Sequence, residues 1–113
     1  MAYSGNKGIK RILLAAGYSW AGFKAAWKNE EAFRQELILA VVFIPLAFYL
    51  QLGGVETALL VSSILLILIV EILNSAIEAL VDLVTTEQHE LAGRAKDMGY
   101  SAVMLALINA TVV

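Results

Sequence analysis

The chain has 113 residues, of which 60% are hydrophobic and 16% are charged, whereas a soluble domain carries about 25% charged residues. This composition predicts a single domain, residues 1–113, that lies mainly in a membrane. The formal net charge of −2 argues against a nucleic-acid binder, which needs a concentrated basic face. Cysteine is absent, so disulfides and thiolate metal sites are excluded.

The N-terminal region, residues 1–30, is predicted to form an amphipathic surface helix. Between Ile9 and Trp27 apolar side chains recur every 3 or 4 positions, and lysines and Arg11 occupy the other side. This pattern is typical of a helix that lies in the plane of the membrane interface. Gly17 and Gly22 weaken the case for one unbroken helix, because an interior glycine costs about 1 kcal/mol relative to alanine.

Three membrane-spanning helices are predicted next, at residues 31–52, 56–84 and 91–113. The first contains Pro45, which a membrane bundle tolerates. All eight Lys and Arg residues lie within 1–36 or at Arg94 and Lys96. By the positive-inside rule, the N-terminus and the 82–97 connection are therefore cytoplasmic, and the 51–56 turn and the C-terminus lie outside.

The inner half of the second span carries a hydrophilic stripe. On a helical wheel, Glu71 shares a sector of about 100° with four further polar residues, namely Asn74, Ser75, Glu78 and Asp82. Ionisable groups at membrane depth are costly and therefore indicate function. The stripe predicts a general base together with carboxylate ligands for a hard cation such as Mg²⁺. The alternative is a solvated helix end with one hydrogen-bonded buried glutamate, and for Asp82 alone this alternative is favoured.

Two further polar clusters have open interpretations. In residues 89–99, Arg94 and Lys96 either hold phosphate oxygens or only anchor the chain at the cytoplasmic surface. In residues 30–36, one glutamate completes a metal site, or the segment is a charged helix start anchored by Arg34, which is the favoured reading. The chain has no P-loop and no protein-kinase signature, so any nucleotide is bound by a different device.

Several sequence blocks, in order, resemble the prokaryotic diacylglycerol kinases, which are small integral membrane enzymes unrelated to soluble kinases. The blocks are AAGYSW at 15–20, AAW at 25–27, NE at 29–30, AFRQE at 32–36, EILNSAIE at 71–78 and HELAGRAKDMG at 89–99. The resemblance implies an all-α membrane protein in the bacterial inner membrane: a homotrimer, each protomer with a surface helix and three spans. It also implies transfer of the ATP γ-phosphoryl group to diacylglycerol, giving phosphatidic acid.

The resemblance also implies roles for individual residues. Glu71 would be the general base, and Glu30 and Glu78 would bind Mg²⁺. The nucleotide contacts would be Arg11, Tyr18, Glu30, Asn74, Glu78, Glu87, Gln88, His89, Lys96 and Asp97. The lipid site, shared across a subunit boundary, would include Ala15, Ala16, Gly17, Ser19, Trp20, Lys24, Ala25, Ala26, Trp27, Ala32, Phe33, Arg34, Gln35, Glu36 and Glu71. One departure is Tyr100, where the family pattern has serine.

Alternative functions remain at this point. The same fold phosphorylates a polyprenol in the related undecaprenol kinases, although the tryptophan-rich segment and the complete HELAGRAKDMG block favour diacylglycerol. A non-enzymatic membrane subunit would use Glu71 to bind and release protons or cations. A purely structural bundle would leave the polar stripe unexplained.

Overall fold

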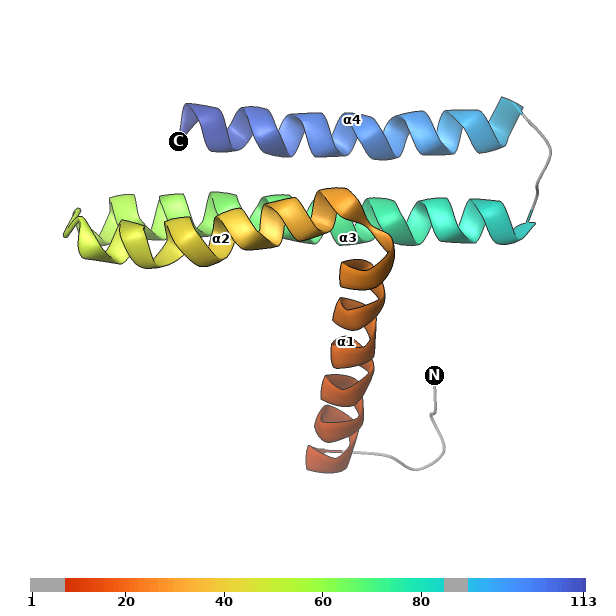
Figure 1. Cartoon of the computed structure of the whole chain (residues 1–113), viewed down its shortest axis with the longest axis horizontal. Coiled ribbons are helices and arrows are strands. Elements are labelled where there is room, and N and C mark those ends of the chain that lie inside the picture. The colour runs from red at the N-terminus through yellow and green to blue at the C-terminus, as the bar shows by residue number, and fades with distance from the viewer. Residues whose placement is uncertain (1–7, 85–89) are drawn as a thin grey trace.

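The structure, a computed structural model, describes residues 8–84 and 90–113. Within these ranges the chain forms four α-helices and no strand: α1 (Ile9–Asn29), α2 (Glu31–Tyr49), α3 (Gly54–Val84) and α4 (Glu90–Val112). Helices α2, α3 and α4 run alongside one another, and α1 projects away from them (Figure 1). The predicted all-α class is therefore confirmed for the described part of the chain.

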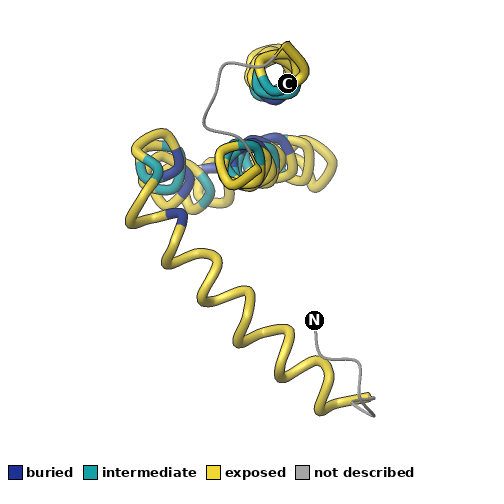
Figure 2. Tube along the Cα trace, turned by 90° about the vertical axis from the view of Figure 1, so that its right-hand side faces the viewer, coloured by how far each residue is buried: buried dark blue, intermediate teal, exposed yellow. Residues whose placement is uncertain are grey.

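Helix α1 is exposed along nearly its whole length (Figure 2). It continues without a break through Gly17 and Gly22, and Ala26 is its one buried residue. Large apolar side chains such as Trp20 and Phe23 are exposed. An amphipathic helix of this kind needs a surface on which to bury its apolar face, and a bilayer interface provides one.

The direction of α1 is fixed at its junction with α2. Glu30 has an extended backbone, with φ −119° and ψ 107°, and separates the two helices. The Arg34 guanidinium Nη1 donates hydrogen bonds to the backbone oxygens of Trp27, at 2.9 Å, and Lys28, at 3.3 Å. Carbonyls in the last turn of a helix lack helical partners. Arg34 thus caps α1 from α2, and the adjacent Phe33 is buried, with 1% of its surface exposed.

Helices α2 and α3 have the length and hydropathy required to cross a membrane. Helix α2 continues past Pro45 and ends at Tyr49, earlier than the predicted limit of residue 52, and Gln51 has a positive φ of 55° in the following turn. Helix α3 has 31 residues. At about 1.5 Å per residue it is longer than the ~30 Å hydrocarbon core. Figure 1 shows α3 and α4 continuing past the level at which α1 leaves the bundle.

Among the described helices, α4 is long enough to cross a membrane, with 23 residues, but it is less apolar than α2 and α3 and is not hydrophobic enough to count as a span. The reason is its polar first half, which contains Glu90, Arg94, Lys96 and Asp97. The third membrane span therefore stays a prediction.

The packed interior of the chain is small. The described chain buries six hydrophobic residues: Ala26, Phe33, Ala40, Ala47, Ile67 and Ala106. The accessible surface is 8641 Å², whereas a folded soluble monomer of this mass would expose about 6,100 Å². Many large hydrophobic side chains of α1, α2, α3 and α4 contribute to this surface. An exposed apolar surface of this kind requires lipid or further protein chains to cover it.

Candidate active site

Glu71 lies at the centre of a group of carboxylates. Its side chain is buried on α3, and the residue is 7% exposed. The carboxylates of Glu36, Glu30 and Glu78 are each close enough to interact with it electrostatically. The fold thus brings the stripe on α3 together with Glu30 and Glu36 at the start of α2. From the sequence alone, the role of the 30–36 segment, which contains Glu30 and Glu36, had been left open.

Asn74 and Glu78 form the next level of the site. Asn74 is 6% exposed, and its Nδ2 donates a hydrogen bond of 3.1 Å to Glu78 Oε1. The Asn74 Oδ1 atom is buried and has no hydrogen-bond partner among the described residues. Gly99 of α4 faces this oxygen, and a Cβ atom on Gly99 would collide with Asn74 Oδ1. The close approach of α4 therefore depends on a glycine at this position.

Two polar contacts join α3 to α4 beyond Asn74. The Tyr100 hydroxyl donates a hydrogen bond to the Glu78 carboxylate. One turn further along α3, Asp82 Oδ1 lies 2.8 Å from Lys96 Nζ. The polar residues of the stripe thus meet α4 residues at successive turns. The helical wheel had placed Asp82 in the stripe and a motif had contained Lys96, but sequence reasoning missed their pairing and missed the contact of Tyr100.

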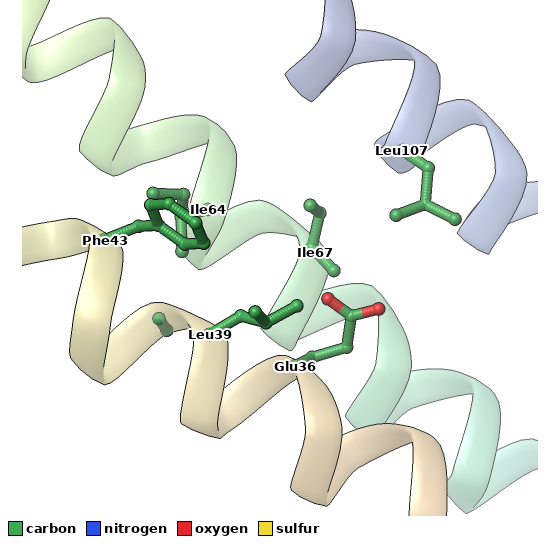
Figure 3. A pocket seen from close by; sticks show the side chains of 7 residues that line it. Glu36, Leu39, Phe43, Ile64, Ile67 and Leu107 are labelled. Atoms are coloured by element: carbon green, nitrogen blue, oxygen red, sulfur yellow. The ribbon is translucent and has the colours of Figure 1, made fainter.

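An apolar cavity of about 270 Å³ adjoins the carboxylates. Helices α2, α3 and α4 all contribute to its wall, whose residues are Glu36, Leu39, Ala40, Phe43, Ile64, Ile67 and Leu107. Glu36 is the one charged residue in this wall, and its carboxylate points toward the space between Ile67 and Leu107 (Figure 3). Ile67 precedes Glu71 by one helical turn, so the cavity lies directly along α3 from the buried glutamate.

A second, wholly apolar cavity of about 470 Å³ lies between α1, α2 and α3. Its wall consists of Phe23, Phe33, Leu37, Leu65, Leu68, Ile69, Ile72 and Leu73. Of the residues that the family resemblance places at the lipid site, Phe33 borders this cavity and Glu36 borders the smaller one. Both spaces suit hydrocarbon chains.

Other predicted site residues are not gathered around Glu71 in the single chain. Arg11 and Tyr18 are exposed on α1, which projects away from α3 and α4 (Figure 1). The remaining α1 positions assigned to the lipid site, apart from the buried Ala26, are also exposed. Asp97 is exposed on α4. Glu87, Gln88 and His89 lie outside the described residues.

The available ligands fit a cation that arrives with phosphate. Within residues 8–84 and 90–113, no three Asp, Glu or His side chains are grouped closely enough to hold a metal ion by themselves. Mg²⁺ usually takes one or two protein carboxylates and completes its shell with substrate phosphates and water. Glu30 and Glu78, both in electrostatic range of Glu71, match that requirement.

These features define a helical membrane protein with a carboxylate-rich polar site on the C-terminal half of its long helix α3. A family model described as prokaryotic diacylglycerol kinase matches residues 17–113. The chain belongs to this family. It is 53% identical over 105 residues to a diacylglycerol kinase of Escherichia coli, covering 93% of this chain and 86% of that protein.

Two further relatives carry the same name. The Pseudomonas aeruginosa diacylglycerol kinase is 54% identical over 110 residues, covering 97% of this chain and 89% of that protein. The Haemophilus influenzae diacylglycerol kinase is 48% identical over 100 residues, covering 88% and 85% respectively. Membership of a kinase family decides between the classes considered above: this chain is an enzyme, not a transport subunit or a passive bundle.

Proposed function

We propose that this protein transfers the γ-phosphoryl group of ATP to the hydroxyl of diacylglycerol, producing phosphatidic acid and ADP. The observation that carries this function is the buried Glu71 on the C-terminal half of α3, set among the carboxylates of Glu30, Glu36 and Glu78 in a member of this family. We assign the protein to the bacterial inner membrane, with its N-terminus and the α3–α4 connection in the cytoplasm.

Glu71 would act as the general base. Its carboxylate accepts the proton of the lipid hydroxyl while the hydroxyl oxygen forms a bond to the γ-phosphorus. The bond between the γ-phosphorus and the β,γ-bridging oxygen breaks, and the electron pair leaves with ADP. Positioned general bases contribute about 10²- to 10⁴-fold to rate. The setting on α3 suits this role, because a diacylglycerol hydroxyl lies near the bilayer interface.

Charge neutralisation is the second requirement of phosphoryl transfer. Glu30, Glu36, Glu71 and Glu78 would repel the phosphates of ATP. Glu30 and Glu78 would hold Mg²⁺, which would supply positive charge to the phosphates. The Lys96 ammonium would donate to phosphate oxygens, and Asn74 Nδ2 keeps the Glu78 carboxylate in a fixed orientation.

The two apolar cavities would receive the hydrocarbon part of the acceptor. The smaller cavity extends along α3 from Glu71 and has Glu36 in its wall, so an acyl chain there would leave a glycerol hydroxyl near the carboxylates. Hydrocarbon cavities alone do not distinguish an acyl chain from a prenyl chain. The names of the relatives favour diacylglycerol over a polyprenol.

The complete site would be assembled from more than one protomer. The exposed apolar surface of α2, α3 and α4 requires a cover, and α1, which carries Arg11 and Tyr18, projects away from the bundle that contains Glu71. In a homotrimer, α1 of one protomer would lie against α3 and α4 of the next. This arrangement would also remove the polar stripe from contact with lipid.

The experiment is a direct assay of two acceptors. The purified protein in lipid bilayers receives γ-labelled ATP, Mg²⁺ and either diacylglycerol or undecaprenol, and the labelled lipid is quantified. Phosphatidic acid should be the preferred product, and Glu71→Gln should reduce its formation about 100-fold or more. Glu56→Gln is the control, because Glu56 is exposed at the opposite end of the same helix. Preferred undecaprenol phosphorylation, or near-normal turnover by Glu71→Gln, would contradict the proposal.

A further inference from the structure

Asp82 and Lys96 form a polar contact between α3 and α4 near the connection of the two helices. Asp82 Oδ1 lies 2.8 Å from Lys96 Nζ. Asp82 follows Glu78 by one turn of α3, and Lys96 precedes Tyr100 by one turn of α4. Because Tyr100 bonds Glu78, two contacts on neighbouring turns bridge the same pair of helices. Lys96 is thereby also held within electrostatic range of Glu78.

Stabilisation of the fold is a poor explanation for this ion pair. The side chains of Lys96 and Asp82 are 38% and 65% exposed. Exposed ion pairs contribute little to folding, because water screens them and two side chains lose their freedom. What the pair does change is the place of the ammonium group, since a lysine stem is flexible and samples many rotamers when it is free.

The geometry leaves the ammonium group able to bind a second partner. An ammonium has three donors, and Asp82 occupies one of them at 2.8 Å. Among the described residues no second hydrogen-bond partner of this ammonium is seen, so its other donors can meet the phosphate of a nucleotide that approaches Glu78. Asp82 on α3 therefore fixes the position of the Lys96 ammonium, which belongs to α4.

We propose that Asp82 is a positioning residue for phosphoryl transfer, which holds the Lys96 ammonium beside Glu78 so that it meets the phosphates of ATP. This inference rests on the proposed kinase reaction. It assigns Asp82 a function for which the sequence alone had favoured a solvated helix end.

An alternative role for Asp82 predicts the opposite change in ATP affinity. If Asp82 only sequestered Lys96, its removal would free the ammonium, and ATP would bind more tightly. If Asp82 positions Lys96, its removal lets the lysine side chain regain rotamers that do not face the phosphates, and ATP binds more weakly. The direction of the change therefore decides between the two.

The test is Asp82→Asn, which keeps the size of the side chain and removes its charge. The KM for ATP at saturating Mg²⁺ should rise about 5- to 30-fold, the range set by the rotamer freedom that an unanchored lysine regains. The kcat should change by less than about twofold, as expected when binding to ground and transition state is lost equally. Calorimetric binding of a non-hydrolysable ATP analogue should weaken by the same factor, and Asp82→Glu should restore part of the affinity.

Two controls make the outcome specific. The first control is Glu90→Gln, which breaks a different ion pair on α4, between Arg94 Nη2 and Glu90 Oε1 at 3.3 Å. This variant should leave the KM for ATP unchanged. In a Lys96→Met background, Asp82→Asn should cause no further loss, because residues that act through one another are not additive. An unchanged or lowered KM for Asp82→Asn in an active wild-type preparation overturns this inference alone. A wild-type protein that makes no phosphorylated lipid would instead overturn the proposed function.

Discussion

Gly99 should be essential to the contact of α3 with α4. A Cβ atom at this position would collide with Asn74 Oδ1, and Asn74 is buried and bonded to Glu78. Gly99→Ala must therefore push α4 away from α3 or rotate the Asn74 side chain. Rotation would break the 3.1 Å hydrogen bond to the Glu78 carboxylate. We expect the variant to be less stable than a glycine-to-alanine substitution at an open position of the same helix, and to lose activity.

The magnitude follows from two opposing effects. If the clash remains, overpacking lowers the unfolding free energy by about 1–3 kcal/mol. If Asn74 rotates instead, the loss of a hydrogen bond to a charged group costs about 1.5–3 kcal/mol. Replacing glycine by alanine within a helix returns about 1 kcal/mol. Because the protein relieves the clash by whichever route costs less, Gly99→Ala should destabilise by about 0–2 kcal/mol net.

Gly93→Ala is the matched control on the same helix. Gly93 is exposed, and nothing lies within 4 Å of where its Cβ would be. It gains the same helix propensity without a clash, so the two variants should differ by about 1–3 kcal/mol. Unfolding in mixed micelles with increasing denaturing detergent, followed by circular dichroism, measures this difference. Equal stability of the two variants would refute the close contact between Gly99 and Asn74.

Two further predictions concern single side chains. Arg34→Met removes the cap on α1 and should lower the unfolding free energy by about 1–3 kcal/mol, measured by the same titration; an unchanged value would show that the cap is dispensable. Tyr100→Phe removes the hydroxyl that bonds Glu78 and should raise the half-saturating Mg²⁺ concentration about 3- to 10-fold. This prediction is checked by electron paramagnetic resonance of Mn²⁺ binding in the presence of an ATP analogue. Tyr49→Phe is the control, because Tyr49 is exposed. Equal Mn²⁺ binding by the two variants would count against a role for the Tyr100 hydroxyl.

The helices themselves were accessible from hydrophobic pattern and charge. The apolar runs with few charges predicted the helices that became α2 and α3, and the periodic apolar residues before Trp27 predicted α1. Gly17 and Gly22 did not interrupt α1, because a helix can keep two glycines where the rest of its sequence favours it. The helical wheel placed Glu71 and Asn74 on one face, and both are buried there.

The contacts between helices were not accessible in this way. Periodicity gives the face of each helix but not the register in which two antiparallel helices pack. The approach of Gly99 to Asn74 sets the register of α3 and α4, and only that register pairs Asp82 with Lys96. Likewise, the sequence favoured Arg34 as an anchor at the helix start, but it did not show that the bend at Glu30 directs the guanidinium back to the end of α1. Each case depends on tertiary geometry that a single sequence does not record.

The arrangement of α1 leads to a prediction about assembly. Arg11 and Tyr18 are exposed on a helix that leaves the bundle, whereas Glu71 is buried on α3. If ATP contacts both groups, one protomer must supply α1 and another must supply α3. An inactive Arg11→Gln variant and an inactive Glu71→Gln variant, mixed in equal amounts before reassembly, should then recover activity. In a cyclic trimer with one shared site per interface, about one quarter of the sites would be intact. Sites formed within single protomers would give no recovery, because every protomer in the mixture would carry one of the two substitutions.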